Sequence, residues 1–255
     1  MTALSGRVAL VTGASHGTGV DVARDLARAG ARVAVHYRSD RAAGEDVAAA
    51  IRAEGGVAEV FAADVARADD VRRLVAQVRE RLGAPGIVVN NAGPFNDAAF
   101  CALREADWDY VMNANLKAVY LTAQLVAPDM QAAGWGRIVN IGATSGLVRS
   151  HGVYGLAKAA LLHLTQSLAL ELAPAVTVNA IVPSQIASAR TDGMPAYKAA
   201  AVAGTPLGRL VTQEEIARMV TRLCSPEFDF VTGQAIVMDG GRTIPRFPKL
   251  NLTQE

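Results

Sequence analysis

A tyrosine and a lysine lie four residues apart in the stretch VYGLAK, at Tyr154 and Lys158. On a helix this spacing puts both side chains on one face, one turn apart. A free phenol has a pKa of about 10 and exchanges its proton poorly near neutral pH, but a neighbouring ammonium group favours the phenolate and lowers that pKa. The pair is therefore a candidate acid–base group for proton transfer. Because the same spacing also occurs by chance on many helices, it needs support from the rest of the chain.

A glycine-rich turn, TGASHGTG, follows the first apolar run and precedes a helical pattern. Positions without a Cβ let the backbone approach a pyrophosphate closely, and the start of a helix offers unpaired N–H groups to an anion. The placement between a strand and a helix turns a weak motif into a predicted dinucleotide site. The residues expected to contact the cofactor here are Gly13, Ser15, His16, Gly17, Thr18 and Gly19.

The end of the second apolar run, HYRSD, bears on which dinucleotide binds. An acidic residue at this place would hold the free 2′-hydroxyl of the adenosine ribose and repel a phosphate. Tyr37 stands there instead, followed by Arg38 and Ser39, and an arginine fork pairs well with a phosphate. This favours NADP(H). Arg38 could equally be an ordinary solvated arginine, and Asp40, three residues beyond Tyr37, argues for the unphosphorylated cofactor.

Two further strand ends carry residues suited to a dinucleotide. ADV closes the third run, where Asp64 and Val65 could hold an adenine amino group and ring edge. NNAG follows the fourth run, and its small residues would let a turn pass close to the cofactor. The residues expected to contact the cofactor in that turn are Asn91, Ala92 and Gly93.

The elements that position these residues follow a regular alternation of short β-rich runs and longer helical stretches. Strands that are apolar on both faces and separated by helices predict a parallel sheet covered on both sides. No linker, low-complexity tract or repeat divides the chain, so residues 1–255 are expected to form a single doubly wound α/β domain. Ligands of such sheets bind beyond the carboxyl ends of the strands, where the residues above lie. The predicted strands are 7–13, 31–37, 57–65, 86–93, 136–143, 175–183 and 235–241.

Composition excludes several classes of protein. Of 255 residues, 51% are hydrophobic and 19% charged, and the formal net charge of +1 gives no electrostatic reason to bind nucleic acid or an anionic membrane. The two cysteines, Cys101 and Cys224, are far apart and lack metal-ligand spacing, so we expect reduced thiols, no metal site and a cytoplasmic protein. The sequence shows neither a leader-like segment nor an apolar run of about 18 residues, so we expect no insertion into a membrane.

Taken together, the motifs resemble those of the short-chain dehydrogenases/reductases, in the branch that contains the β-ketoacyl carrier-protein reductases. The resemblance covers residues 5 to 241 and rests on TGASHGTG, DV, NNAG, NANL, YGLAK, VNAIVP and TGQAIVMDGG, in the family's order and spacing. It implies a Rossmann-type sheet of about seven strands in the order 3-2-1-4-5-6-7, with helices on both faces. It also implies hydride transfer between a nicotinamide and a carbonyl or alcohol.

The resemblance assigns roles to the candidate catalytic residues. Tyr154 would donate the proton to the carbonyl oxygen, and Lys158 would also hold the nicotinamide ribose. Asn115 matches the family asparagine that holds a water in a proton relay to the lysine. Asn113 is the nearby competitor, and a buried asparagine could also be purely structural.

One family residue is missing. The pattern after the fifth strand places a serine three residues before a glycine, and anchoring on Gly146 puts Ala143 at that position. The segment from Gly146 to Tyr154 is also about two residues shorter than in many relatives. We expect Ser145, or next Thr144, to supply the missing hydroxyl, although both could merely cap the turn that follows.

The segment after the sixth strand is expected to cover the substrate. There the resemblance places Pro183, Ile186 and Ser188 against the cofactor, while Ser184 replaces a family glycine. Residues 185–208 read as a mobile lid over a largely apolar pocket. The residues expected to line that pocket are Pro94, Phe95, His151, Met194, Pro195, Tyr197 and Val202.

These observations favour an NADPH-dependent reductase of a ketone or ketoacyl substrate. The alternatives are a reductase of a C=N bond or pteridine, and a family member that binds a dinucleotide but is catalytically impaired because of Ala143. The helix that carries Tyr154 is apolar over much of its circumference, which implies a homodimer or homotetramer. The tail, residues 242–255, is expected either to wrap over a neighbouring subunit or to be disordered.

Overall fold

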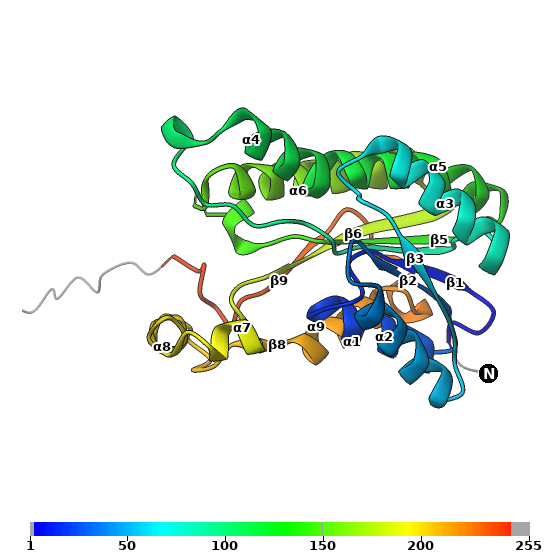
Figure 1. Ribbon diagram of the computed structural model, residues 1–255, viewed down its shortest axis with the longest axis horizontal. Helices are drawn as coiled ribbons and strands as arrows, with labels where there is room; N and C mark the ends of the chain where they lie inside the picture. The colour runs from blue at the N-terminus through cyan, green and yellow to red at the C-terminus, as the bar shows by residue number, and fades with distance from the viewer. Residues whose placement is uncertain (1–2, 149, 246–255) are drawn as a thin grey trace, which may run out of the picture.

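Seven strands pair in parallel into one sheet in the order β3-β2-β1-β4-β5-β6-β9 (Figure 1). The structure is a computed structural model that describes residues 3–148 and 150–245. The predicted strand order is confirmed, with β9 as the seventh strand along the sheet. The strands are β1 (Val8–Val11), β2 (Arg32–Tyr37), β3 (Val57–Ala62), β4 (Ile87–Asn90), β5 (Gly136–Ile141), β6 (Val176–Pro183) and β9 (Ala235–Met238).

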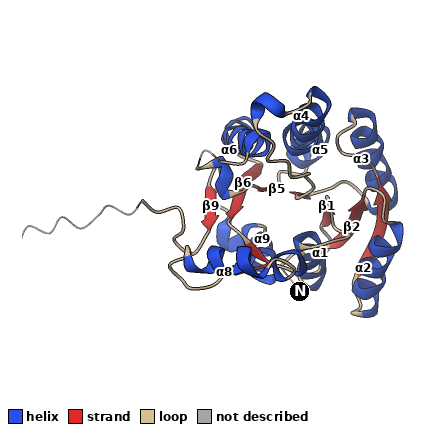
Figure 2. Cartoon of the chain, turned by 60° about the vertical axis from the view of Figure 1, so that its left-hand side comes forward, coloured by secondary structure: helices blue, strands red, loops and turns tan. Residues whose placement is uncertain are grey.

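Helices cover both faces of the sheet, as predicted (Figures 1 and 2). Helices with one apolar stripe bury it on a sheet and leave their polar side to solvent. Among the described residues, no helix is long and apolar enough to cross a membrane. One face carries α1 (Thr18–Arg28), α2 (Arg41–Ala53) and α9 (Gln213–Leu223), and the other carries α3 (Ala68–Leu82), α5 (Ala118–Ala132) and α6 (Gly152–Leu172).

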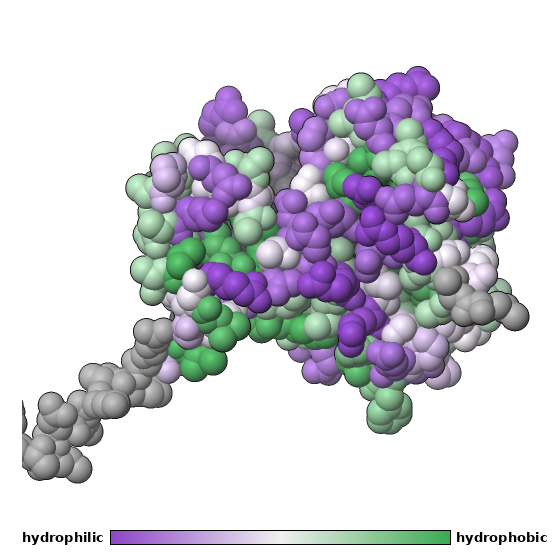
Figure 3. All heavy atoms as spheres, turned by 90° about the horizontal axis from the view of Figure 1, so that it is seen from below, coloured by the Kyte–Doolittle hydropathy of each residue, from purple (hydrophilic) through white to green (hydrophobic). Residues whose placement is uncertain are grey.

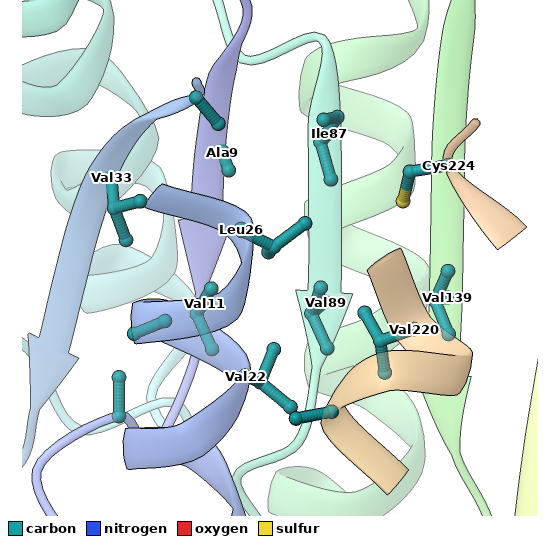
Figure 4. Packing of buried hydrophobic residues seen from close by; sticks show 14 of the residues in the cluster. Ala9, Val11, Val22, Leu26, Val33, Ile87, Val89, Val139, Val220 and Cys224 are labelled. Atoms are coloured by element: carbon teal, nitrogen blue, oxygen red, sulfur yellow. The ribbon is translucent and has the colours of Figure 1, made fainter. Parts of the chain in front are cut away.

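The core beneath α1, α2 and α9 covers one face of the sheet. Val22 and Leu26 of α1 point toward the sheet, and Val220 of α9 lies beside them (Figure 4). All three are fully buried, which contributes about 1.5–3 kcal/mol for each side chain. The sheet residues that meet them in Figure 4 are Ala9, Val11, Val33, Ile87, Val89 and Val139. A second core, under α3, α5 and α6, covers the opposite face.

Several short elements form the rim of the sheet's carboxyl end. Helix α4 (Glu105–Met112) continues through a π-helical turn, Asn113–Lys117, into α5. The predicted lid contains β7 (Ile186–Ala187), α7 (Ala189–Asp192) and α8 (Pro195–Ala203). Strand β7 pairs in parallel with β8 (Val211–Thr212) as a second sheet that the sequence did not predict. Residues 246–255 of the predicted tail lie outside the described residues.

A buried chain of polar side chains fixes α6 on the sheet. Asn90 of β4 donates to Asn140 of β5 at 2.9 Å, and Asn140 in turn donates to the Thr165 hydroxyl of α6 at 2.9 Å. The Thr165 hydroxyl donates to the Leu161 carbonyl one turn earlier, at 2.8 Å. Burying a polar group without a partner is costly, so this chain of hydrogen bonds favours one position of α6.

Replacing Thr165 with valine keeps the side-chain shape but leaves the Asn140 amide without its acceptor. We expect Thr165→Val to lower the free energy of unfolding by about 1–3 kcal/mol, measured by urea denaturation. Thr221→Val on α9 is the matched control, because the buried Thr221 hydroxyl has no hydrogen-bond partner among the described residues. The control should not lower stability, because Thr221→Val removes a buried hydroxyl and leaves no unpaired partner behind. Equal losses in the two variants would contradict the role given to the polar chain.

Candidate active site

The glycine turn after β1 takes its shape from positions that only glycine tolerates. Gly13 and Gly17 have φ of +64° and +56°, in the left-handed region. A Cβ at Gly19 would overlap the Gly13 carbonyl oxygen, so the turn can close onto α1 only without one. No side chain of the described residues caps the start of α1, so its first N–H groups remain available to an anion.

His36, a residue that the sequence analysis missed, clamps this turn to the neighbouring strand end. Its Nδ1 accepts the Gly13 N–H at 2.9 Å, so the tautomer that fits places the proton on Nε2, which donates to the Ala63 carbonyl at 3.0 Å. The His36 carbonyl accepts the Ala14 N–H at 2.8 Å. Burial lowers the pKa of His36 to about 4, which keeps the ring neutral near pH 7. The signal in the sequence was a lone histidine inside an apolar strand.

A second clamp joins the glycine turn to the turn after β4. The Thr12 hydroxyl accepts the N–H groups of Asn91 and Ala92 at 2.9 and 3.0 Å. The Asn91 side chain donates back to the carbonyls of Thr12 and Gly13, at 3.0 and 3.1 Å. These reciprocal bonds hold the two turns side by side at the carboxyl end of the sheet.

The two turns form one wall of a cavity of about 530 Å³, here called the first cavity. Tyr37 does not line it, because its ring is buried against Gly44 of α2. Gly17, Thr18 and Gly19 also lie outside the lining, where α1 begins. The predicted cofactor residues that do line the cavity are Gly13, Ser15, His16, Arg38, Ser39, Asp64, Val65, Asn91, Ala92 and Gly93.

One cation of the first cavity, Arg38, is available to an anion. Asp40 is already engaged, because its carboxylate caps α2 by accepting the Ala43 N–H at 3.0 Å and lies 3.3 Å from His16 Nε2. Arg38 donates to the hydroxyl of Tyr110 and has no carboxylate partner within residues 3–148 and 150–245. The guanidinium is therefore free to pair with a bound phosphate.

A second cavity, of about 460 Å³, adjoins the first, and Gly93 lines both. Its walls come from the turn after β5, the start of α6 and the lid. Predicted residues that the structure brings together here are Phe95, Thr144, Ser145, His151, Tyr154, Pro183, Ile186, Ser188, Met194 and Tyr197. Pro94 lines the first cavity instead, and Pro195 and Val202 line neither cavity.

Tyr154 and Lys158 lie on α6 as their spacing predicts, with the Lys158 Nζ 5.5 Å from the centre of the Tyr154 ring. Lys158 is buried, and its ammonium donates to the Ile141 carbonyl at the end of β5 at 2.8 Å. Burial lowers the pKa of Lys158 to about 8 and raises the pKa of Tyr154 to about 12, an increase that the charge of Arg190 opposes. Burial therefore makes the phenol a weaker acid, and the charge of Arg190 acts against that effect.

Asn115 sits in the π-helical turn between α4 and α5. Its amide donates to the carbonyls of Pro94 and Val111 at 3.0 and 3.1 Å, which fixes the side chain. The buried Oδ1 has no partner among the described residues, so it can accept a hydrogen bond from a water or ligand. Because a Cβ at Gly93 would overlap this oxygen, the glycine between the two cavities also sets the position of Asn115.

Ala143 supplies no hydroxyl to the second cavity, which Thr144 and Ser145 also line. Residues Thr144–Gly146 form a 3₁₀ turn in which Thr144 is half-buried and Ser145 is buried. The Ser145 hydroxyl has no hydrogen-bond partner within the described residues. Burying a hydroxyl is unfavourable unless a ligand or water supplies its hydrogen bond. This need for a partner distinguishes Ser145 from Thr144.

The ring of Phe95 packs against three other side chains of the second cavity. The Phe95 ring lies edge-on to those of Tyr154 and His151, with centres 5.0 and 5.3 Å apart. The Arg190 guanidinium lies 5.5 Å from the centre of the Phe95 ring. Arg190 was not predicted from the sequence, since nothing in the pattern of the lid distinguishes it from a surface arginine.

Comparison with known proteins gives consistent matches over nearly the whole chain. Residues 13–243 match the sequence model of a family described as enoyl-(acyl carrier protein) reductase. The chain is 38% identical over 242 residues to the 3-oxoacyl-[acyl-carrier-protein] reductase of Pseudomonas aeruginosa, which covers 93% of this chain and 98% of that protein.

Solved structures agree with these sequence matches. A gluconate 5-dehydrogenase from Burkholderia cenocepacia in complex with NADP and tartrate superposes with a TM-score of 0.87 at 33% identity, covering 94% of this chain and 96% of that one. A blue fluorescent protein from a metagenomic library in complex with NADPH also gives 0.87, at 32% identity, covering 95% and 100%.

The buried His36 predicts a specific dependence of stability on pH. The unfolded chain binds a proton at His36 near pH 6.5, whereas the folded chain resists it until about pH 4. The unfolded state therefore binds more protons in this window, and the free energy of unfolding should fall by about 3 kcal/mol as the pH drops through it. His36→Asn keeps an acceptor for the Gly13 N–H but has no titrating ring. Its free energy of unfolding, measured with denaturant, should therefore not show this fall between pH 6.5 and pH 4.

Two outcomes would contradict this account. One is a pair of stability–pH curves for the wild type and His36→Asn that run parallel from pH 7 to pH 4. The other is an NMR titration of the wild-type ring that shows protonation near pH 6.5. The NMR measurement does not depend on how well the variant folds.

Proposed function

The chain belongs to the short-chain dehydrogenase/reductase family, and from that premise we propose that it is an NADPH-dependent reductase of a carbonyl substrate, with Tyr154 as the proton donor. The observation that carries the proposal is the junction of the two cavities at Gly93. A dinucleotide in the first cavity would extend past Gly93 toward the Tyr154 phenol in the second.

The lining of the first cavity fits NADP(H). The uncapped start of α1 and the glycine turn suit a pyrophosphate, while Arg38 and Ser39 suit a ribose phosphate. Asp40, the residue that argued for the unphosphorylated cofactor, is already engaged in capping α2. Pro183, Ile186 and Ser188 would support the nicotinamide end from the second cavity. When bound, NADPH supplies the hydride.

Within the second cavity the chain's own residues handle the proton. Tyr154 gives its phenolic proton to the substrate oxygen, and the Lys158 ammonium stabilises the phenolate that remains. One ammonium proton is used at the Ile141 carbonyl, which leaves two donors for a ribose hydroxyl or a water. The unpaired Asn115 Oδ1 would hold that water and connect Lys158 to solvent.

Ser145 is our candidate for the hydroxyl missing at Ala143. Its unpaired, buried Oγ would polarise the substrate carbonyl from the turn that faces Tyr154. Thr144 is the second candidate, because it lines the same cavity but is more exposed.

We also propose that the protein is a homodimer or homotetramer. A groove of about 440 Å³ between the π-helical turn and α6, lined by Leu116, Tyr120 and Leu164, would be covered by a second copy. Hydrophobic residues also gather where the described chain ends (Figure 3), including Leu207 and Ile244, which are 70% and 66% exposed. Such patches on a soluble chain mark interaction surfaces.

The test of the proposed function combines cofactor titration with a carbonyl panel. NADPH should bind tightly by fluorescence, and ketones or ketoacyl thioesters should be reduced. Tyr154→Phe should lower kcat about 10²–10⁴-fold while cofactor affinity remains unchanged, because only the proton donor is lost. Tight NADPH binding without turnover of any carbonyl would instead identify an impaired dinucleotide-binding protein, and turnover confined to imines or pterins would identify the other alternative.

The replacement hydroxyl can be tested separately. Ser145→Ala should lower kcat about 10²–10³-fold with little change in NADPH affinity, as the loss of one donor to a developing oxyanion does. Thr144→Val, the matched control one residue away, should change kcat by much less. Full activity in Ser145→Ala together with a loss in Thr144→Val would reverse the assignment.

A further inference from the structure

We propose that the second cavity takes an oxo acid, a substrate whose reacting carbonyl is accompanied by a carboxylate, and that Arg190 binds this carboxylate. The inference rests on the proposed function for the reduction of the carbonyl. It adds the chemical class of the substrate and a specificity-determining residue outside the proton-transfer group.

Arg190 is a cation without an anionic partner in the wall of the second cavity. Within the described part of the chain it forms no ion pair, whereas nearby cations of the same region are paired. Lys198 is 2.6 Å from Asp192, and Arg209 is 2.7 Å from Glu215. A guanidinium offers two parallel N–H donors that match the two oxygens of a carboxylate. A carboxylate is therefore the ligand that fits Arg190 best.

The Phe95 ring holds this cation close to the reacting position. Arg190 lies over the ring at 5.5 Å, and the same ring touches Tyr154 with their centres 5.0 Å apart. A cation over an aromatic face is positioned with little loss of charge, so its N–H groups remain available to a ligand. A carboxylate bound there would lie only a few carbon atoms from a carbonyl held at the Tyr154 hydroxyl.

The other charged or ionisable groups near the second cavity are less suited than Arg190 to bind a carboxylate. Asp97 also lines the wall and is exposed, as Arg190 itself is, and the two make no ion pair in the described part of the chain. Lys158 is buried behind Tyr154 and is used by the Ile141 carbonyl. His151 is held in the left-handed region at φ 62°, an unusual conformation for a non-glycine residue, and its ring lies edge-on to that of Phe95.

The experiment compares each oxo acid with its own methyl ester, which keeps the carbonyl and the carbon skeleton but removes the charge. The series is 3-oxobutanoate, 4-oxopentanoate and 5-oxohexanoate with NADPH. Because Arg190 also acts on the ionisation of Tyr154, its replacement changes turnover of acid and ester alike. The ratio of their kcat/KM values isolates recognition of the carboxylate from that shared effect.

We expect the wild type to prefer at least one acid over its ester, and Arg190→Met to lower that ratio about 10–100-fold. Arg190→Lys, which keeps the charge but not the fork, should lie between them. Lys198→Met, which removes a neighbouring cation of the lid, should leave the ratio unchanged. An unchanged ratio in Arg190→Met, or an equal loss in Lys198→Met, would overturn the inference.

A binding measurement separates the inference from the proposed function. Calorimetric titration of the same acids and esters into the NADP⁺-saturated protein should show tighter binding of an acid, lost in Arg190→Met. Reduction of the esters without any preference for the acids would refute the inference and leave the reductase standing. Arg190-dependent binding of the acids without reduction of either series would support the carboxylate site and refute the reductase.

Discussion

The candidate active site depends on a buried ammonium group held against the end of a strand. Lys158 is only 4% exposed, and its Nζ donates to the Ile141 carbonyl, the last residue of β5. A charge in this environment is strongly unfavourable without a partner, so α6 can pack only where that contact forms. The polar chain that ends at Thr165 fixes the same helix two turns further on. Tyr154, one turn before Lys158, then has to lie at the wall of the second cavity.

The resulting site sets two physical effects against each other. Burial raises the pKa of Tyr154, which weakens it as an acid, whereas positive charge nearby lowers that pKa. Lys158 supplies one cation from α6 itself, and Arg190 supplies another from the lid. If Tyr154 is the proton donor, as proposed, the lid would act on the chemistry through the charge of Arg190.

Much of the fold could be predicted because apolar runs and glycine turns report local structure directly. The third strand ends at Ala62 instead of residue 65, since Asp64 turns the chain by accepting the Ala66 N–H. The two-residue strands β7 and β8 carry no periodicity, so only the folded chain reveals them.

The site residues that belong to recognisable sequence motifs could be predicted. The residues whose side-chain direction depends on tertiary packing could not be predicted as well. Tyr37 turns under α2 because Gly44 leaves room for its ring, a choice that sequence position does not determine. His36 and Arg190 matter because of what lies across from them in space. The catalytic and cofactor-binding roles themselves remain predictions.

The proposed chemistry depends on Tyr154 being a partly buried phenol whose ionisation is controlled by nearby positive charge. Ultraviolet difference titration of the wild type against Tyr154→Phe isolates this one phenol from the other tyrosines. The account predicts no Tyr154 ionisation up to about pH 11 in the chain alone, since its pKa is about 12, and ionisation at a clearly lower pH with saturating NADP⁺. Ionisation near pH 10 in the chain alone, or a titration that NADP⁺ leaves unchanged, would contradict it.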